Sequence, residues 1–403
     1  MENLPMKKSF LITGAAVVAT GISSAFAADI KVGSAGGITG PIPDLVAPMM
    51  AARDLAAKHI NEQGGLLDGD NYMLVKGDSK CDAKGAVDTG QKLVNVEQVV
   101  AIIGPNCSGA TIGMAESVTI PAGVVILSES ATAPSITDLE DKGLVFRNAP
   151  SDAYQGAALA DMVMESGYNK VAVTYANDDY NKGIAEVFEA AFKSGGGMIT
   201  ASAEHEPEKA SYTSEISTLS RSGAEALMVF AYYGSSGTTI IRNSLENGLF
   251  DMFFGADGMR NEEIITDIGA DNLRGKIMVS APSSDTESSS YKMFAEEFSA
   301  AGEDPSAVYT PGSYDAAFLM ALAIEKAGGT DRGAIAEALM EVANAPGEAI
   351  MPGQWEKAKA AIAAGRDINY QGASGSIEFD ANGDVAGTYS LSVIDNNGKW
   401  VEK

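Results

Sequence analysis

The fold class is decided by the stretch Val99-Val100-Ala101-Ile102-Ile103-Gly104-Pro105-Asn106-Cys107-Ser108-Gly109-Ala110-Thr111. Its apolar first part predicts a buried strand, and a polar turn then carries the chain into a helical pattern. Such a turn leaves backbone N–H groups and the positive end of a helix dipole free to hold a carboxylate. Ser108 could add a hydroxyl donor to this seat, or it could act only as a helix N-cap.

A second polar turn of the same kind follows the next apolar run. Residues 124–128 predict a strand, and the chain continues as Glu129-Ser130-Ala131-Thr132-Ala133-Pro134. In an open parallel sheet both turns lie at the carboxyl ends of neighbouring strands, where ligands bind. The two turns therefore predict one binding edge.

Short β-rich runs alternate with amphipathic stretches along the rest of the chain. This alternation is typical of βαβ units and predicts an α/β fold with mostly parallel sheets. The expected strands are 30–34, 72–76, 99–103, 124–128, 171–175, 226–231 and 276–280, and the expected helices are 48–61, 86–95, 155–166, 184–193 and 316–326.

Chain length predicts two lobes, since 403 residues exceed what one hydrophobic core usually serves. We expect residues 28–149 plus 280–386 in the first lobe and 150–279 plus 387–403 in the second. The crossings are expected near 147–151, near 280–284, and within a last pair of strands at 375–380 and 387–395. An extra segment, 346–370 with a helix at 354–364, lengthens the last return.

Residues 1–27 are interpreted as a signal peptide. Lys7 and Lys8 precede an uncharged run, and Ala25-Phe26-Ala27 predicts cleavage before Ala28. An exported protein enters an oxidising compartment, so Cys81 and Cys107 are expected to form a disulfide, with two buried thiols as the alternative. Closing this loop stabilises the fold by about 3 to 3.5 kcal/mol.

Net charge and missing motifs exclude several function classes. The net charge of -26 disfavours nucleic acid as a partner, and it mainly keeps the protein soluble. His59 and His205 lack metal-ligand spacing, and no nucleophile elbow, P-loop or dinucleotide fingerprint occurs. Residues 380–384 superficially match a calcium loop, but a hairpin turn explains them better. We expect a protein that is not an enzyme and has no cofactor or metal.

Four pieces of the chain, in order, resemble the periplasmic Leu/Ile/Val-binding proteins of ABC importers. They are Asn61-Glu62-Gln63-Gly64-Gly65, Val100 to Pro105, Ser130-Ala131-Thr132-Ala133-Pro134 and Tyr314-Asp315-Ala316-Ala317. The resemblance implies two Rossmann-like lobes with a three-crossing hinge that close on a small molecule. It also implies a periplasmic monomer that captures an amino acid for permease subunits in the inner membrane. The alternative is a ligand sensor of the same fold for amides, short acids or aromatic carboxylates.

The resemblance also implies the ligand-binding residues. Ser108, Ser130 and Thr132 correspond to the family's contacts to the ligand carboxylate and part of its ammonium group. Asp257, in Gly255-Ala256-Asp257-Gly258, corresponds to the acid that binds the ammonium, although an Asp before Gly is also a common turn former. The aromatic contacts correspond to Tyr180, to Tyr233 or its neighbour Tyr232, and more loosely to Tyr309; each could instead be a packing residue.

Two departures leave the ligand open. Leu45 stands where the branched-chain binders place an aromatic residue, and Glu129 stands where a small residue or Pro is common. Glu129 would put a second acid beside the pocket, favouring a ligand with an additional positive group, or it would lie on the rim and have no influence.

Overall fold

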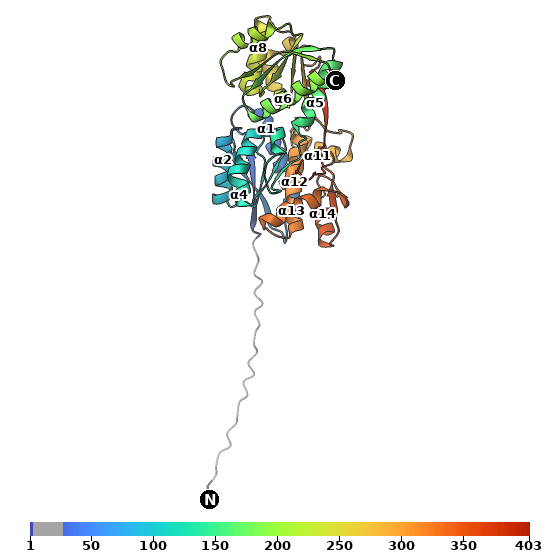
Figure 1. Ribbon diagram of the computed structural model, residues 1–403. Helices are drawn as coiled ribbons and strands as arrows, with labels where there is room; N and C mark the ends of the chain where they lie inside the picture. The colour runs from blue at the N-terminus through green and yellow to red at the C-terminus, as the bar shows by residue number, and fades with distance from the viewer. Residues whose placement is uncertain (3–26) are drawn as a thin grey trace.

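The computed structural model describes residues 1–2 and 27–403, so the predicted signal peptide lies almost wholly outside the described residues. The chain forms two α/β lobes, one above the other in Figure 1, each built on its own sheet. The predicted α/β fold is therefore confirmed. Among helices in the described part of the chain, none has the length and apolarity needed to cross a bilayer.

The first lobe contains a five-stranded parallel sheet in the order β2-β1-β3-β4-β5. Alternate residues of a strand pack on opposite faces, because successive side chains point to opposite sides. Ala101 and Ile103 thus join the core under α1, α12 and α13, whereas Ile102 packs toward α2 and α3. The strands are β1 (Asp29–Gly36), β2 (Asn71–Asp78), β3 (Ala101–Ile103), β4 (Val125–Ser128) and β5 (Val145–Arg147).

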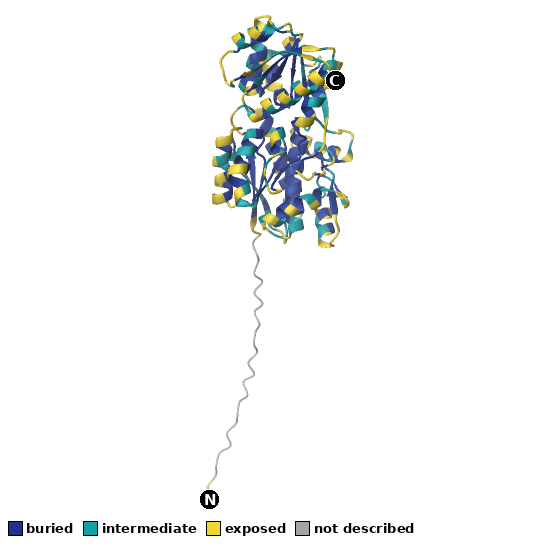
Figure 2. Ribbon diagram, in the orientation of Figure 1, coloured by how far each residue is buried: buried dark blue, intermediate teal, exposed yellow. Residues whose placement is uncertain are grey.

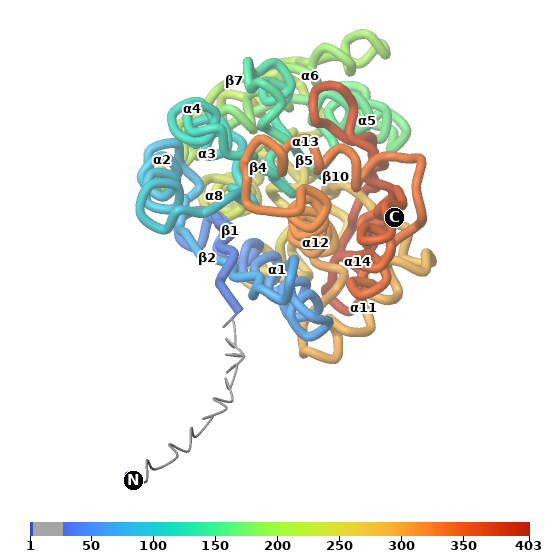
Figure 3. The backbone as a smooth tube through the Cα atoms, turned by 90° about the horizontal axis from the view of Figure 1, so that it is seen from below, coloured from blue at the N-terminus to red at the C-terminus, as the bar shows by residue number. Residues whose placement is uncertain are grey.

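Helices cover both faces of this sheet. Figure 3 shows α1 and α12 side by side, with α2, α3 and α4 gathered elsewhere around the sheet. Helix α12 is buried along nearly its whole length, as expected for a helix at the centre of a lobe. The helices are α1 (Pro43–Glu62), α2 (Ala83–Gln91), α3 (Ser108–Met114), α4 (Ile120–Ala122), α11 (Ser289–Ala300), α12 (Thr310–Ala327) and α13 (Arg332–Ala343), with short η1 (Lys92–Val96), η2 (Ala115–Thr119) and η3 (Pro134–Ile136).

The second lobe contains a seven-stranded sheet in the order β14-β13-β10-β9-β8-β6-β7. Its strands from β7 to β10 are parallel, and β13 and β14 add antiparallel at one edge. Figure 2 shows the strands of both sheets as largely buried. The strands are β6 (Lys170–Ala176), β7 (Met198–His205), β8 (Ala226–Phe230), β9 (Phe253–Gly255), β10 (Ile277–Ser283), β13 (Thr388–Ile394) and β14 (Trp400–Glu402).

Two groups of helices sandwich the second sheet. Apolar residues of α5 and α6 pack on one face, and those of α7 and α8 pack on the other. The helices are α5 (Asp152–Glu165), α6 (Asp179–Ser194), α7 (Thr213–Ser220), α8 (Thr238–Glu246), α9 (Glu262–Ile268) and α10 (Ala270–Leu273), with short η4 (Tyr233–Gly237) and η5 (Asp257–Met259).

Within residues 27–403 the chain passes between the sheets after β5, after β10 and before β13. The expected strand at 375–380 is wrong, since this segment belongs to no sheet. It is held instead by a side chain: Asn344 Oδ1 accepts from the Phe379 N–H (2.8 Å), and Asn344 Nδ2 donates to the Phe379 carbonyl oxygen (2.7 Å). Hydrogen bonding to a side chain satisfies the backbone without a strand partner.

The extra segment packs on the first lobe. It contains the two-stranded sheet of β11 (Glu348–Ile350) and β12 (Ile368–Tyr370) and the expected helix, α14 (Trp355–Ala363). Trp355 is fully buried, and its indole N–H donates to the Gly65 carbonyl oxygen (3.0 Å). The segment therefore covers the far end of α1 and α12, away from the two polar turns.

Candidate ligand-binding site between the lobes

The first polar turn leaves β3 through a position that only glycine fits. Gly104 has φ +84, and a Cβ there would lie 2.1 Å from the Ala35 carbonyl oxygen. Helix α3 then begins at Ser108, while the N-cap is Cys107. The alternative in which Ser108 is only an N-cap is therefore wrong, and its hydroxyl is free for other contacts.

Side-chain hydroxyls join the two polar turns to each other. Ser108 Oγ accepts hydrogen bonds from the N–H groups of Thr132 (3.2 Å) and Ala133 (3.1 Å). Ser130 Oγ donates to the Asn106 carbonyl oxygen (3.0 Å). Thr132 Oγ1 is fully buried and has no hydrogen-bond partner among the described residues. The structure thus brings the three predicted hydroxyls of the first lobe together at one edge of the sheet.

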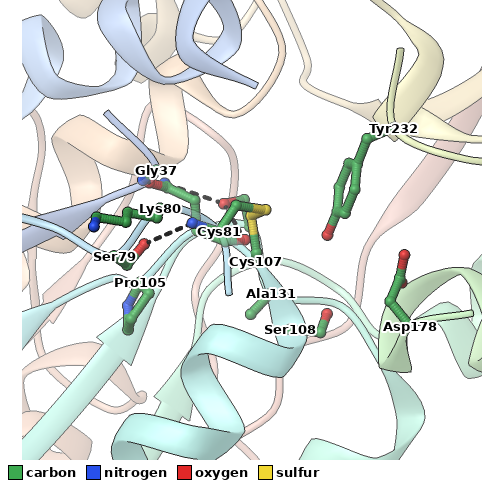
Figure 4. Close-up of a disulfide and its surroundings, with 12 residues drawn as sticks. Gly37, Ser79, Lys80, Cys81, Pro105, Cys107, Ser108, Ala131, Asp178 and Tyr232 are labelled. Atoms are coloured by element: carbon green, nitrogen blue, oxygen red, sulfur yellow. Dashed lines mark hydrogen bonds between the residues drawn. A yellow bond between two sulfur atoms is a disulfide. The ribbon is translucent and has the colours of Figure 1, made fainter. Parts of the chain in front are cut away.

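The two turns are braced from behind. The predicted disulfide is present and joins Cys107, next to Ser108, to Cys81 (Figure 4). The Arg147 guanidinium donates to the Ala133 carbonyl oxygen (2.9 Å) and binds Asp384 with both of its forked nitrogens, at 2.5 and 2.9 Å. A bidentate arginine fixes position as well as charge. The first-lobe half of the site is therefore held in place by its own side chains.

Glu129 does not lie on the rim of the cleft, so that interpretation is wrong. Its carboxylate is fully buried in an ion pair with Arg53, whose side chain is also fully buried. It accepts further hydrogen bonds from Asn106 Nδ2 (2.9 Å) and Ser313 Oγ (3.3 Å). Because a buried charge requires a partner, the acid and the arginine neutralise each other, and Glu129 adds no net charge beside a ligand.

The second-lobe half of the site is centred on Asp257. Its side chain accepts hydrogen bonds from the Tyr180 hydroxyl (3.0 Å), the Tyr309 hydroxyl (2.8 Å) and Gln155 Nε2 (2.9 Å). Asp257 is only 4 % exposed, so its side chain is a buried, hydrogen-bonded acid and not only a turn residue. Burial raises the pKa of this carboxyl, and the three hydrogen bonds oppose that rise.

Of the two neighbouring tyrosines, Tyr232 lies with this cluster. Its ring stacks on Tyr180 with the centroids 5.1 Å apart. Figure 4 draws Tyr232 and Asp178 on one side and Ser108 of the first lobe facing them. The Tyr233 hydroxyl instead lies 3.5 Å from Asp44 Oδ2 of the first lobe.

Asp152 is the residue that the sequence analysis missed. It is the first residue of α5, and its N–H donates to the Thr132 carbonyl oxygen (2.8 Å). Both carboxylate oxygens are buried and have no hydrogen-bond partner in the described part of the chain. Burial and then the nearby Asp257 raise the pKa of Asp152 well above its ordinary value, while the Thr132 side chain and Arg147 oppose that rise. An Asp in the first turn of a helix looks like routine dipole compensation, so the sequence gives no sign of this role.

Four residues with linked positions form what we call the acceptor cluster: Thr132, Asp152, Gln155 and Asp257. Asp152 contacts Thr132 through the backbone, Gln155 lies one helical turn after Asp152, and Gln155 bonds Asp257. Thr132 Oγ1, both Asp152 oxygens and Gln155 Oε1 are buried without a partner among residues 27–403. Such a gathering is unusual, because buried polar atoms are nearly always hydrogen-bonded.

The lobes touch around this cluster, and glycines permit the close approach. A Cβ on Gly234 would lie 2.3 Å from the Pro41 carbonyl oxygen, and one on Gly109 would lie 2.7 Å from Asp179 Oδ2. Thr132 and Asp152 are fully buried in this arrangement. A ligand can therefore reach the cluster only when the lobes move apart.

Both histidines are hydrogen-bonded to hydroxyl groups. The His205 ring bonds Thr174 Oγ1 (2.7 Å) and Ser236 Oγ (2.8 Å), and burial lowers its pKa to about 4. His59 Nδ1 lies 2.8 Å from the Tyr314 hydroxyl. No group of three or more metal-ligating side chains occurs within the residues that the structure covers.

Comparison with known proteins agrees with this geometry. Residues 48–397 match the family described as "Receptor family ligand binding region". The leucine-, isoleucine-, valine-, threonine- and alanine-binding protein of Pseudomonas aeruginosa is 31% identical over 328 residues, which cover 81% of this chain and 86% of that protein. The chain belongs to the Leu/Ile/Val-binding protein family. Its relatives are binding proteins rather than enzymes.

Solved structures with the same fold extend the match. The leucine-binding protein LivK of Thermotoga maritima has a TM-score of 0.79 at 23% identity, covering 93% of this chain and 97% of that one. LivJ of Streptococcus pneumoniae, solved with isoleucine, has a TM-score of 0.76 at 25% identity, covering 93% of this chain and all of that one. The two-lobed architecture is thus that of the Leu/Ile/Val-binding family.

In this member of the Leu/Ile/Val-binding family, most of the predicted site residues lie in two groups. Ser108, Ser130 and Thr132 lie together on the first lobe. Tyr180 and Asp257 lie together on the second lobe, and Tyr309, the N-cap of α12 in the first lobe, joins them through its hydroxyl. Tyr233 lies beside Asp44 instead, and Leu45 is a buried residue of α1. Their roles toward a ligand stay predictions.

Proposed function

We propose that this protein is the extracytoplasmic solute-binding component of an ABC importer and captures an α-amino acid between its lobes. The observation that carries the proposal is the acceptor cluster, with its four buried acceptor atoms that lack partners. An ammonium group brings three N–H donors and a positive charge, which is what such a cluster lacks. The Ser108 and Ser130 hydroxyls lie on the facing lobe, within the part of the site assigned to the carboxylate.

The physical gain comes from closing the lobes over opposite charges. Attraction between an ammonium and the Asp152 and Asp257 carboxylates strengthens as water is expelled, because the local dielectric falls. The two halves belong to different lobes, so the ligand itself links them. This supports a capture protein that performs no chemistry on its ligand.

The same charges disfavour the alternative of a sensor for short or aromatic acids. Asp152 and Asp257 are buried acids, and the one cation that influences Asp152, Arg147, is occupied by Asp384. A ligand whose only charge is a carboxylate would meet like charge in a dry cleft. Neutral amides escape this repulsion but offer no cation to the acid pair.

The relatives indicate which class of amino-acid side chain the ligand carries. The Pseudomonas relative is named for binding leucine, isoleucine, valine, threonine and alanine, and the Streptococcus structure holds isoleucine. We propose a branched-chain or similar small amino acid, with Tyr180, Tyr232 and Tyr309 supplying the aromatic contacts. Leu45 gives an aliphatic surface where the resemblance implies an aromatic one.

The remaining assignments belong to the same proposal. We propose cleavage of the signal peptide before Ala28, a periplasmic monomer, and delivery of the ligand to permease subunits of the inner membrane. The lobe boundaries are proposed as 28–149 plus 280–386 and 150–279 plus 387–403. The strands before 148 form one sheet and those at 170–283 and 388–402 form the other, which supports this division except at residues 280–283, because β10 (Ile277–Ser283) belongs to the second sheet.

Titration calorimetry with matched ligands tests the proposal. L-leucine should bind one to one, whereas 4-methylpentanoate, which lacks the ammonium group, and 3-methylbutylamine, which lacks the carboxylate, should bind at least about 100-fold more weakly. Benzoate serves as the probe for the sensor alternative. Equal affinity for leucine and 4-methylpentanoate, or tight binding of benzoate, would contradict an amino-acid receptor.

A further inference from the structure

The acceptor cluster holds two acids that share one dry space. Asp152 is fully buried and Asp257 is 4 % exposed, and the charge of Asp257 raises the pKa of Asp152 beyond the effect of burial. Gln155 lies one turn after Asp152 on α5 and donates to Asp257 Oδ1 (2.9 Å). Two carboxylates confined in this way cannot both carry a full charge without a nearby cation.

The groups that face Asp152 supply no such cation. Arg147 is the one positive group among them, and its Nε and Nη2 are bound to Asp384 at 2.5 and 2.9 Å. The other facing groups are an acid and neutral hydroxyls, which cannot neutralise two charges. The titratable and charged groups that influence Asp152, or that it influences, are Asp257, Arg147, Tyr180, Tyr232, Tyr309 and Tyr389.

The two acids differ in how many hydrogen bonds their carboxylates accept. Asp257 accepts from Tyr180, Tyr309 and Gln155, and these bonds favour its charged form. Both oxygens of Asp152 lack a hydrogen bond of normal geometry among the described residues, and although the Thr132 side chain and Arg147 favour its charged form, burial and Asp257 outweigh them and raise its pKa. The proton shared by the pair is therefore more stable on Asp152, where it also gives a buried oxygen atom a hydrogen to donate.

We infer that the ligand-free protein with its lobes together carries one proton on the Asp152–Asp257 pair, and that capture of the ligand's ammonium group releases this proton to solvent. The proton leaves an Asp152 carboxyl oxygen, and the incoming N–H groups take its place beside that oxygen. Charge balances, because one positive charge replaces another between the same two acids. This inference rests on the proposed function and adds regulation by pH at the same site.

The direction of the pH effect follows from linkage. If binding releases a proton, the affinity rises with pH and levels off once both acids are ionised before binding. Below that point the affinity changes by up to about tenfold per pH unit for one released proton. An acidified compartment therefore weakens capture even though the ligand's own ammonium stays charged.

Calorimetry of the full chain with L-leucine in buffers of different ionisation enthalpy tests the inference. We expect the observed binding heat to depend linearly on the buffer enthalpy, with a slope that approaches about one released proton at acidic pH. Asp152→Asn keeps the shape and removes the titrating group, so its slope should fall toward zero. Asp161→Asn, an exposed change on the same helix, should keep the wild-type slope.

The outcomes separate this inference from the proposed function. Leucine binding with a heat independent of the buffer overturns proton release and leaves the receptor function intact. No binding of leucine, or of the other amino acids tried, overturns both. Proton release that persists unchanged in Asp152→Asn assigns the proton to another group and contradicts the inference, and the wild-type measurement decides the matter even if Asp152→Asn does not fold.

Discussion

The two halves of the cleft differ in how complete they are. On the first lobe, Ser108 and Ser130 are bonded into the backbone of two turns, which a disulfide and the Arg147 fork brace from behind. On the second, Asp152 and Gln155 leave buried acceptor atoms without partners among residues 27–403. The first half is neutral, and its Ser108 and Ser130 hydroxyls are hydrogen-bonded while Thr132 Oγ1 has no partner among the described residues; the second half is anionic. Under the proposed function, this difference assigns the selection of ligand charge mainly to the second lobe.

The difference between the two halves is tested most directly by removing one predicted ligand contact from each half. Asp257→Asn should weaken leucine binding more than about 100-fold, because it removes a buried charge from the ammonium. Ser108→Ala should weaken it about tenfold, the value of one hydrogen bond to a charged group. Calorimetry measures both affinities. A larger loss for Ser108→Ala would reverse the assignment of the two halves.

Removing the disulfide should show how much the stability of the first-lobe half depends on the Cys81–Cys107 bond. The double change Cys81→Ser and Cys107→Ser should lower the free energy of unfolding by about 3 kcal/mol, since the closed loop spans a sequence separation of 26. Urea unfolding followed by circular dichroism measures this loss. An unfolding midpoint equal to that of the wild type would show that the loop is already ordered without the bridge.

Contact between the lobes can be weakened without removing any of the predicted ligand-binding side chains. Gly234→Ala places a Cβ against the Pro41 backbone oxygen, at 2.3 Å, and this clash should oppose closure of the lobes. The free energy of leucine binding should become less favourable by about 1 to 3 kcal/mol. Gly109→Ala is the matched control, because its Cβ meets only the side chain of exposed Asp179, at 2.7 Å. Equal affinities for the two variants would contradict closure at Gly234.

The smallest expected effect concerns stability without ligand. The pKa of Asp152 is raised in the folded protein, so the unfolded chain ionises first and stability falls as the pH rises through the folded value. Asp152→Asn should therefore raise the melting temperature of the ligand-free protein at neutral pH by about 1 to 3 °C. The gain should shrink at a pH low enough to protonate Asp152 in both states, and scanning calorimetry at two pH values measures it. A lower melting temperature at neutral pH would show that Asp152 contributes a favourable charge.

Much of the fold could be predicted because local pattern and global fold agree. The apolar runs at 99–103 and 226–231 are short and bounded by turn residues, so they indicate buried strands. Strand β9 escaped prediction because it has only three residues, and β7 because it is largely exposed and lacks a clear apolar face. The expected strand at 375–380 failed because Asn344, distant in sequence, holds that backbone.

Within the site, the sequence by itself determined the pieces that a continuous motif carries. Ser108, Ser130 and Thr132 lie in two turns at strand ends, and a parallel sheet must bring such turns together. The disulfide also followed from the expected compartment, while Asp257 was indicated by the family resemblance. What only the tertiary structure decided is which buried acids have a cationic partner. Glu129 is neutralised by Arg53, while Asp152 lies unpaired beside Asp257. The physical reason is that the charge of a buried acid depends on partners far away in sequence, which chain order does not show.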